Sequence, residues 1–379
     1  MACSSEETTR TAETTSQMKP IAFRSYTAEP TRSSAVYSAE NGINAGQSIG
    51  IYAYYHDHTT WSNAAVPNFM WNQKATCLTK GTDFEYSPLK YWPNDDNSKV
   101  SFIAYFPYTV ESPGQTDSPA YPDNPTGLKT LLTNEGTNNL GENDTNLPAF
   151  SFTVKESKDD QVDFLLTELL PNLPNGTNSV SPSSADDRSG LTVTDHVRFL
   201  FKHMTAKVEF RIVADAAIHK DIVSFSLSEL SVSNLRYSGT LIPAYDPEEG
   251  ETSFSWATNA VTHNYDFKTY EPQLLLPQEL GDNVKMNVSY SITFKSDGTT
   301  YHYVNGEPVA DQEYTYTKSD VVQLNKMKRT GTDDALTKWE PNHHYIYTIR
   351  LRANRIDFTG QVVDWGDTHD IEGIEIKDE

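Results

Sequence analysis

The chain has 379 residues, with 52 acidic residues against 30 Lys and Arg, so its formal net charge is −22. A strongly acidic surface repels phosphate backbones and anionic lipid head groups, which argues against nucleic acid and against direct electrostatic membrane binding. Aromatic residues make up 11% of the chain, which argues against disorder because aromatic side chains bury large areas. No run of about 18 apolar residues occurs that could span a bilayer.

Residues 1–18 are predicted to be a disordered lipoprotein tether. The Thr-rich segment up to Gln17 has no apolar periodicity, and such a segment buries too little apolar surface to fold. Cys3 follows the small residue Ala2 and precedes Ser-Ser-Glu-Glu, an order that resembles the surface-export signal of lipoproteins in Bacteroidales. We therefore expect lipidation at Cys3, by acyl chains such as palmitate. The alternative is that Cys3 is incidental.

Alternation of apolar and polar residues dominates the rest of the chain, which is typical of half-buried β-strands. It is clearest over residues 49–54, 197–201, 208–212, 284–294 and 345–351. Residues 100–106 are almost all apolar and predict a central strand. No segment shows a sustained period of 3.6 with caps at both ends. The sequence therefore predicts an all-β fold, built as sandwiches with Pro- and Gly-rich turns.

Two turn-rich stretches interrupt this pattern. Residues 171–189 contain Asn-Gly, Ser-Pro and Ser-Ser and only one large apolar residue, Leu173, so they predict a linker. We therefore expect an N-terminal β-sandwich domain over residues 19–190. A C-terminal β-sandwich domain with a short C-terminal extension is expected over residues 191–379. Residues 111–147 are long for a connection and predict a surface excursion within the first domain.

Metal and catalytic signatures are weak. His56-Asp57-His58 could place two imidazoles on one strand face as a metal clamp, but no third ligand follows from the spacing, and an exposed loop is the favoured interpretation. His343 and His344 would point to opposite faces of a strand. Nucleophile motifs such as Gly-x-Ser-x-Gly and phosphate-binding motifs are absent. We expect no enzyme activity, no metal and no cofactor.

Several other side chains are interpreted as core residues. His203 follows an apolar strand face and predicts a hydrogen-bonded core histidine. Cys77 predicts a small core residue. Tyr86, Tyr91 and Trp92 cluster around Ser-Pro. Such a cluster is either core or an exposed platform for stacking sugars, and we favour core because large apolar side chains rarely stay exposed without a partner.

Several segments, in a fixed order along the chain, resemble the fimbrillin family of Bacteroidales, which comprises the Mfa-like and major fimbrial subunits. The shared order of the segments carries the match. The resemblance covers about residues 19 to 367. The segments that carry it are residues 48–54, 84–93, 100–108, 162–166, 199–208, 274–278 and 339–365.

The resemblance implies two tandem transthyretin-like (Greek-key) β-sandwich domains. It also implies that an Arg-specific protease removes the first strand and that a strand from a neighbouring subunit fills the groove. Here the first strand would be Lys19 to Tyr26, with Ile21 and Phe23 on one face. Arg32 is the expected cleavage position, Arg24 is disfavoured inside the strand, and an ordinary loop arginine is the alternative for Arg32. The physical basis is that an unpaired edge and an apolar slot are both satisfied by a donated strand.

The expected function is therefore a structural or adhesive subunit of cell-surface fimbriae. Its expected partners are other fimbrial subunits, the Arg-specific protease and, through the lipid anchor, the outer membrane; host or bacterial surface ligands are left open. The donor strand would come from the carboxyl terminus, where Ile371, Ile374 and Ile376 lie. The alternative function is a surface glycan-binding lipoprotein of a nutrient-uptake system.

Overall fold

The protein is described from a computed structural model of the whole chain. The structure describes residues 19–31, 34–38, 42–63, 65–95, 97–110, 126–132, 138, 140, 146–174, 196–214, 222–295, 303–304, 307–308, 313–329, 334–351, 356–364 and 374–375. Apart from two 3₁₀ turns, Lys158–Asp160 and Leu324–Lys326, every regular element in these ranges is a strand. The prediction of an all-β fold is confirmed. Within the same ranges, no helix has the length and apolar character needed to cross a bilayer.

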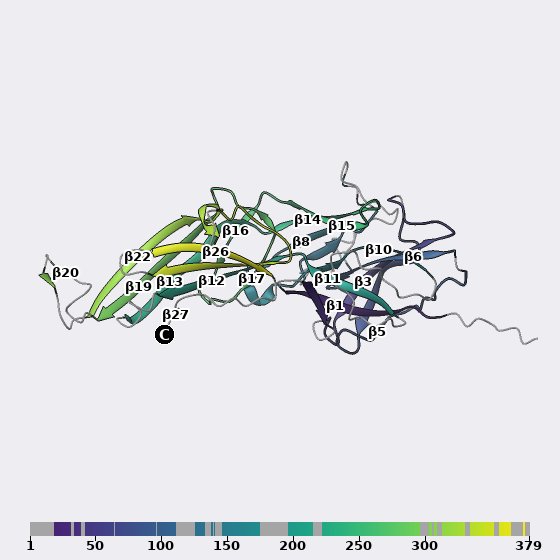
Figure 1. Cartoon of the computed structure of the whole chain (residues 1–379), viewed down its shortest axis with the longest axis horizontal. Helices are drawn as coiled ribbons and strands as arrows, with labels where there is room; N and C mark the ends of the chain where they lie inside the picture. Colours follow the sequence, from purple (N-terminus) through teal and green to yellow (C-terminus); the bar gives the residue numbers. More distant parts are fainter. Residues whose placement is uncertain are drawn as a thin grey trace, which may run out of the picture.

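The largest sheet has nine strands, eight of them in the order β2-β1-β11-β9-β6-β3-β4-β5, with β10 pairing to β6. β1 runs parallel to β11, and the remaining pairs of this sheet are antiparallel. Figure 1 places this sheet in the purple, blue and teal part of the molecule. Its strands are β1 (Ala22–Thr31), β2 (Ser34–Ser38), β3 (Ser48–His56), β4 (Met70–Cys77), β5 (Phe84–Glu85), β6 (Lys99–Phe106), β9 (Leu165–Thr167), β10 (Leu170–Pro174) and β11 (His196–His203).

Three further sheets make up most of the remainder. One has the order β17-β12-β25-β26-β23 with β27 paired to β12, the second β16-β13-β19-β22, and the third β15-β14-β8-β7. Two short pairs, β18 with β24 and β20 with β21, complete the topology. The strands are β7 (Leu128–Thr130), β8 (Phe150–Thr153), β12 (Ala206–Ala214), β13 (Ile222–Arg236), β14 (Ser238–Asp246), β15 (Glu251–Thr258), β16 (Thr262–Asp266), β17 (Gln273–Leu275), β18 (Gln278–Glu279), β19 (Lys285–Lys295), β20 (Tyr303–Val304), β21 (Glu307–Pro308), β22 (Glu313–Gln323), β23 (Lys328–Arg329), β24 (Lys338–Trp339), β25 (His343–Leu351), β26 (Ile356–Asp364) and β27 (Ile374–Glu375).

The molecule is elongated, with β13, β19 and β22 toward one end and β3, β5 and β6 toward the other (Figure 1). Two sheets combine strands from both sides of residue 190. β11 lies in the nine-stranded sheet, and β14 and β15 share a sheet with β7 and β8. The division into domains at residues 190 and 191 stays a prediction, and so does the arrangement as two transthyretin-like sandwiches.

Two hydrophobic clusters flank the nine-stranded sheet. Because side chains alternate along a strand, β3 directs Tyr52 and Tyr54 into one cluster and Ile49 and Ile51 into the other. The first cluster continues through β8, β12, β19 and β25 and forms the main core of the molecule. The second is confined to the opposite face of the nine-stranded sheet. This sheet is therefore buried on both faces.

Two expectations about loops are corrected. The stretch over residues 111–147 is not wholly a surface excursion, because Leu128–Thr130 forms β7 and Leu132 and Leu147 are buried in the main core. The linker begins later than expected, because Leu170–Pro174 forms β10 and buries Leu173 in the second cluster. The apolar residues in both stretches pack against a sheet. The turn-rich composition of the stretches does not indicate this contact, because it is made with distant parts of the chain.

Candidate functional site

The first described strand, β1, lies inside the nine-stranded sheet. Its first half pairs in parallel with β11, from Ala22 opposite His196 to Thr27 opposite Phe201. Its second half pairs antiparallel with β2, from Thr27 to Thr31. The expected strand Lys19 to Tyr26 therefore begins a little later and runs further than the sequence indicated.

The side chains of Ile21 and Phe23 are buried in the second cluster, with exposed fractions of 1% and 0%. The Phe23 ring stacks on Phe199 at a centroid distance of 5.4 Å and meets Tyr86 at 5.2 Å and Phe102 at 6.0 Å. Burying two such side chains contributes about 1.5–3 kcal/mol each. The three rings around Phe23, which we call its seat, therefore hold the strand in addition to its backbone hydrogen bonds.

A loop segment closes the edge of β1 that β11 leaves free. Residues 78–93, which we call the strap, connect the end of β4 to the chain leading to β6 and include the short β5. The Trp92 N–H donates to the Lys19 carbonyl at 3.0 Å, and the Ile21 N–H donates to the Lys90 carbonyl at 3.0 Å. An isolated bridge pairs Pro20 with Tyr91 between these two bonds.

The strap also meets β1 at Ser25, beside a crossing of two glycines. The Ser25 N–H donates to the Gly81 carbonyl at 3.0 Å, and the buried Ser25 Oγ accepts from the Ile43 N–H at 3.1 Å. A Cβ on Gly42 would lie 2.6 Å from the Ser25 carbonyl oxygen and 2.5 Å from the Gly81 Cα. Only glycine allows these backbones to approach so closely.

Some of the predicted site residues are among those that the structure describes, and others are not. Ile21 and Phe23 are described and share one buried face, while Arg24 lies inside β1 as expected. Arg32 and Cys3 lie outside the described residues. Cleavage, lipidation and removal of the strand stay predictions.

Three of the predicted histidines have hydrogen-bond partners within the protein. His203 is buried, and its Nδ1 lies 3.0 Å from Asp163 Oδ1, which confirms the hydrogen-bonded core histidine. The buried His344 Nε2 lies 3.0 Å from Glu209 Oε2, whereas His343 Nδ1 lies 2.8 Å from the Pro341 carbonyl.

The exposed loop favoured for this histidine pair is confirmed for His58 and wrong for His56. His56 ends β3 in a buried position, with its Nε2 2.8 Å from Ser101 Oγ, and burial lowers its pKa below the ordinary value. His58 is exposed, and its Nε2 lies 3.7 Å from Asp57 and 3.6 Å from Asp95. Among the described residues no group of three or more His, Cys, Asp or Glu side chains is placed to hold a metal ion.

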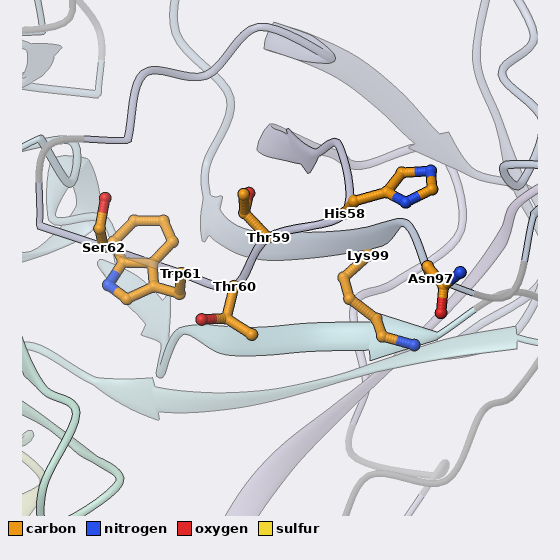
Figure 2. A pocket seen from close by; sticks show the side chains of 7 residues that line it. All are labelled: His58, Thr59, Thr60, Trp61, Ser62, Asn97 and Lys99. Atoms are coloured by element: carbon orange, nitrogen blue, oxygen red, sulfur yellow. The ribbon is translucent and has the colours of Figure 1, made fainter.

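A shallow pocket beside His58 is lined mostly by polar side chains. Its loop is anchored by Trp61, whose backbone N–H donates to Asn172 Oδ1 at 2.6 Å and whose ring meets the Tyr54 ring edge-on at a centroid distance of 4.8 Å. Sequence analysis did not single out Trp61, because its partners are distant in the chain. Figure 2 shows the lining residues His58, Thr59, Thr60, Trp61, Ser62, Asn97 and Lys99.

The aromatic cluster of the strap is core with one exception. Tyr86 and Trp92 are buried in the second cluster, as favoured from the sequence, and buried Cys77 lies in the same cluster. For Tyr91 the prediction is wrong, since 42% of it is exposed. Consecutive residues of an extended segment point to opposite sides, so a buried Trp92 leaves Tyr91 facing outward.

Known proteins resemble this chain in sequence family and in fold. No curated protein matches it. A fimbrial protein from Bacteroides vulgatus is 16% identical with a TM-score of 0.52, and 91% of this chain and 99% of that chain are covered. The tip fimbrial protein Mfa3 from Porphyromonas gingivalis is 11% identical with a TM-score of 0.33, covering 92% and 99%. A fimbrilin (fimA) from the same organism is 10% identical with a TM-score of 0.32, covering 92% and 97%.

The first of these three similarities shows a shared fold. The family described as fimbrillin-like matches residues 31–365, which is most of the chain. This match agrees with the resemblance seen in the ordered sequence segments. The chain belongs to the fimbrillin-like family and is not an enzyme.

Proposed function

We propose that this protein is a subunit of cell-surface fimbriae that polymerises by exchange of its first strand. The observation that carries the proposal is the seat of Phe23, a fully buried ring in a cluster separate from the main core. The fimbrial protein from Bacteroides vulgatus, which has a similar fold, supports the same role.

Loss of β1 would leave a site with two unmet requirements. The edge of β11 would lose its parallel partner over His196 to Phe201, and unpaired strand edges invite another strand. The rings of Tyr86, Phe102 and Phe199 would lose Phe23 as their packing partner. A donated strand with an apolar residue at that position meets both requirements at once.

The proposed cleavage follows Arg32, which with Ser33 connects β1 to β2. The residues around this position are small and polar, as at preferred sites of proteolytic nicking, and a cut there separates the whole of β1 from the rest of the chain. Arg24 is disfavoured because it lies within β1 and is half-buried.

Digestion of the purified protein with an Arg-specific protease tests this proposal. We expect a new amino terminus at Ser33 by mass spectrometry and a ladder of polymers on unheated gels. Arg32→Gln should abolish both, whereas Arg329→Gln, at an exposed arginine of β23, should abolish neither. Cutting elsewhere while Arg32 stays intact contradicts the proposed cleavage. Absence of polymer together with tight glycan binding favours the glycan-binding alternative.

Membrane attachment is proposed to occur through lipid on Cys3. The small residue before it and the Ser-Ser-Glu-Glu that follows support this assignment. Metabolic labelling with an alkyne palmitate should mark the protein produced in its native host, and Cys3→Ala should lose the label. Equal labelling of both proteins refutes lipidation at Cys3.

A further inference from the structure

The strap holds the residue immediately before β1, Ile21, at both of its backbone groups. The Ile21 N–H donates to the Lys90 carbonyl at 3.0 Å. The Ile21 carbonyl accepts from the Tyr86 hydroxyl at 2.7 Å, in a buried position. Tyr86 Oη also lies 3.4 Å from the Lys90 nitrogen and 3.4 Å from its oxygen. One tyrosine hydroxyl thus joins the strand and the strap.

Tyr86 combines this hydrogen bond with apolar packing. Its ring meets Phe23 at 5.2 Å, so it touches the strand through both its hydroxyl and its ring. Burial raises the pKa of Tyr86 to about 12, so the hydroxyl stays a proton donor well above neutral pH.

The chain from Lys19 into the first half of β1 is enclosed along both backbone edges. β11 occupies one edge from Ala22 onward, and the strap occupies the other through Lys19, Ile21 and Ser25. The second cluster packs against Ile21 and Phe23. A strand that leaves or enters sideways must therefore break the hydrogen bonds to the strap.

We infer that the strap forms the second side of the site that holds the first strand, opposite β11. We also infer that the hydrogen bond from Tyr86 to Ile21, which we call the latch, sets the rate of strand exchange. The inference rests on the proposed function, because it assigns a role within strand exchange. It also specifies the partner, which is an extended segment of another fimbrial subunit.

The geometry restricts that segment in two ways. Backbone hydrogen bonds to β11 and to the strap accept any extended chain, and β1 itself runs parallel to β11. The seat of Phe23 is selective, because three rings surround a side chain with no exposed surface. The incoming segment should therefore run parallel to β11 and carry a large apolar residue at the position of Phe23.

The test uses the full chain with a recognition sequence for a viral cysteine protease inserted between Ser33 and Ser34. Cutting there makes residues 1–33 a separate peptide whether or not Arg32 is a natural cleavage position. A fluorescein-labelled peptide with the sequence of residues 19–31 is then added in excess, and fluorescence anisotropy reports its exchange. Tyr86→Phe should speed exchange about five- to tenfold, the effect of losing one buried hydrogen bond.

Tyr345→Phe is the matched control. The Tyr345 hydroxyl accepts from the Glu340 N–H at 2.7 Å in a different sheet, so its loss should leave exchange unchanged. Thermal unfolding verifies that both variants fold. Equal exchange rates for Tyr86→Phe and the parent overturn the latch, as does an absence of exchange in either protein.

A second measurement tests the partner. A labelled peptide with Phe23→Ala should bind at least about 100-fold more weakly, because truncation of a buried Phe to Ala removes large packing energy. Equal binding of both peptides overturns the selective seat. The proposed function is tested separately, because the uncut protein either forms polymers after Arg-specific digestion or does not, whatever the exchange rates are.

Discussion

The nine-stranded sheet and the four-stranded sheet of β16, β13, β19 and β22 bury their strands differently. In β3 the residues from Ile49 to Tyr54 are all buried, because clusters cover both faces. In β19 buried and half-buried residues alternate, with Met286, Val288, Tyr290 and Ile292 inward. The first sheet lies between two cores, whereas the second covers one core and meets solvent on its other face.

The outer face of the four-stranded sheet carries paired hydroxyl groups. The cross-strand pairs between β19 and β22 are Ser289 with Ser319 at 2.8 Å, Ser291 with Thr317 at 2.9 Å and Thr293 with Thr315 at 3.0 Å. Such pairs satisfy each other and also bind water, so they stabilise the folded state only modestly. Removal of a strand from this sheet would expose the apolar side chains of one face. Removal of β1 would instead open an apolar site bounded by β11 on one side and the strap on the other.

The largest expected effect is at the seat of β1. Phe23→Ala leaves a cavity among three rings and should destabilise the protein by about 3–5 kcal/mol, measured by urea unfolding. Val321→Ala, at a position 64% exposed on β22, is the control and should change stability by less than about 0.5 kcal/mol. A loss of unfolding free energy below about 1 kcal/mol in Phe23→Ala would show that the Phe23 ring is not buried among these three rings.

A smaller effect is expected from His56, at the end of β3. Burial lowers its pKa, so below about pH 6.5 the unfolded chain takes up a proton that the folded chain does not. Stability should therefore fall as the pH drops from there toward the lowered pKa of the folded state. His56→Gln, which does not titrate, should reduce this slope in urea unfolding measured across the pH range. An unchanged slope in His56→Gln argues against burial of the imidazole.

The smallest effect is expected on the hydroxyl face. Thr317→Ala removes the partner of Ser291 but leaves the Ser291 hydroxyl free to bind water, so the change should stay within about 0.5 kcal/mol. A loss above about 1 kcal/mol in urea unfolding would mean that this face is shielded from solvent and that the contrast between the sheets is weaker than described.

Regular periodicity made much of the fold predictable. The alternation over residues 284–294 matches β19, and the apolar run over residues 100–106 matches the central strand β6. In the same way, a spacing of two residues puts Ile21 and Phe23 on one face of a strand, and both are buried. These features depend on local pattern, which the sequence shows directly.

Features built from distant or backbone contacts were not predictable. The three-residue β7 exists because Leu128–Thr130 pairs with β8, and nothing in its own loop composition indicates this. The strap binds β1 chiefly through backbone groups, which every residue has. The hydroxyl of Tyr86 meets an oxygen 65 residues away, and only the tertiary structure brings the two together.

The short strand β2 depends entirely on β1. It lies at the end of the nine-stranded sheet and pairs only with β1 among the described strands, from Thr27 opposite Ser38 to Thr31 opposite Ser34. Its amide hydrogens are therefore protected from exchange with solvent deuterium only while β1 is seated. The two strands should open as one cooperative unit. Deuterium uptake over residues 34–38 would therefore show whether β1 occupies its site, even when the incoming segment carries no label of its own.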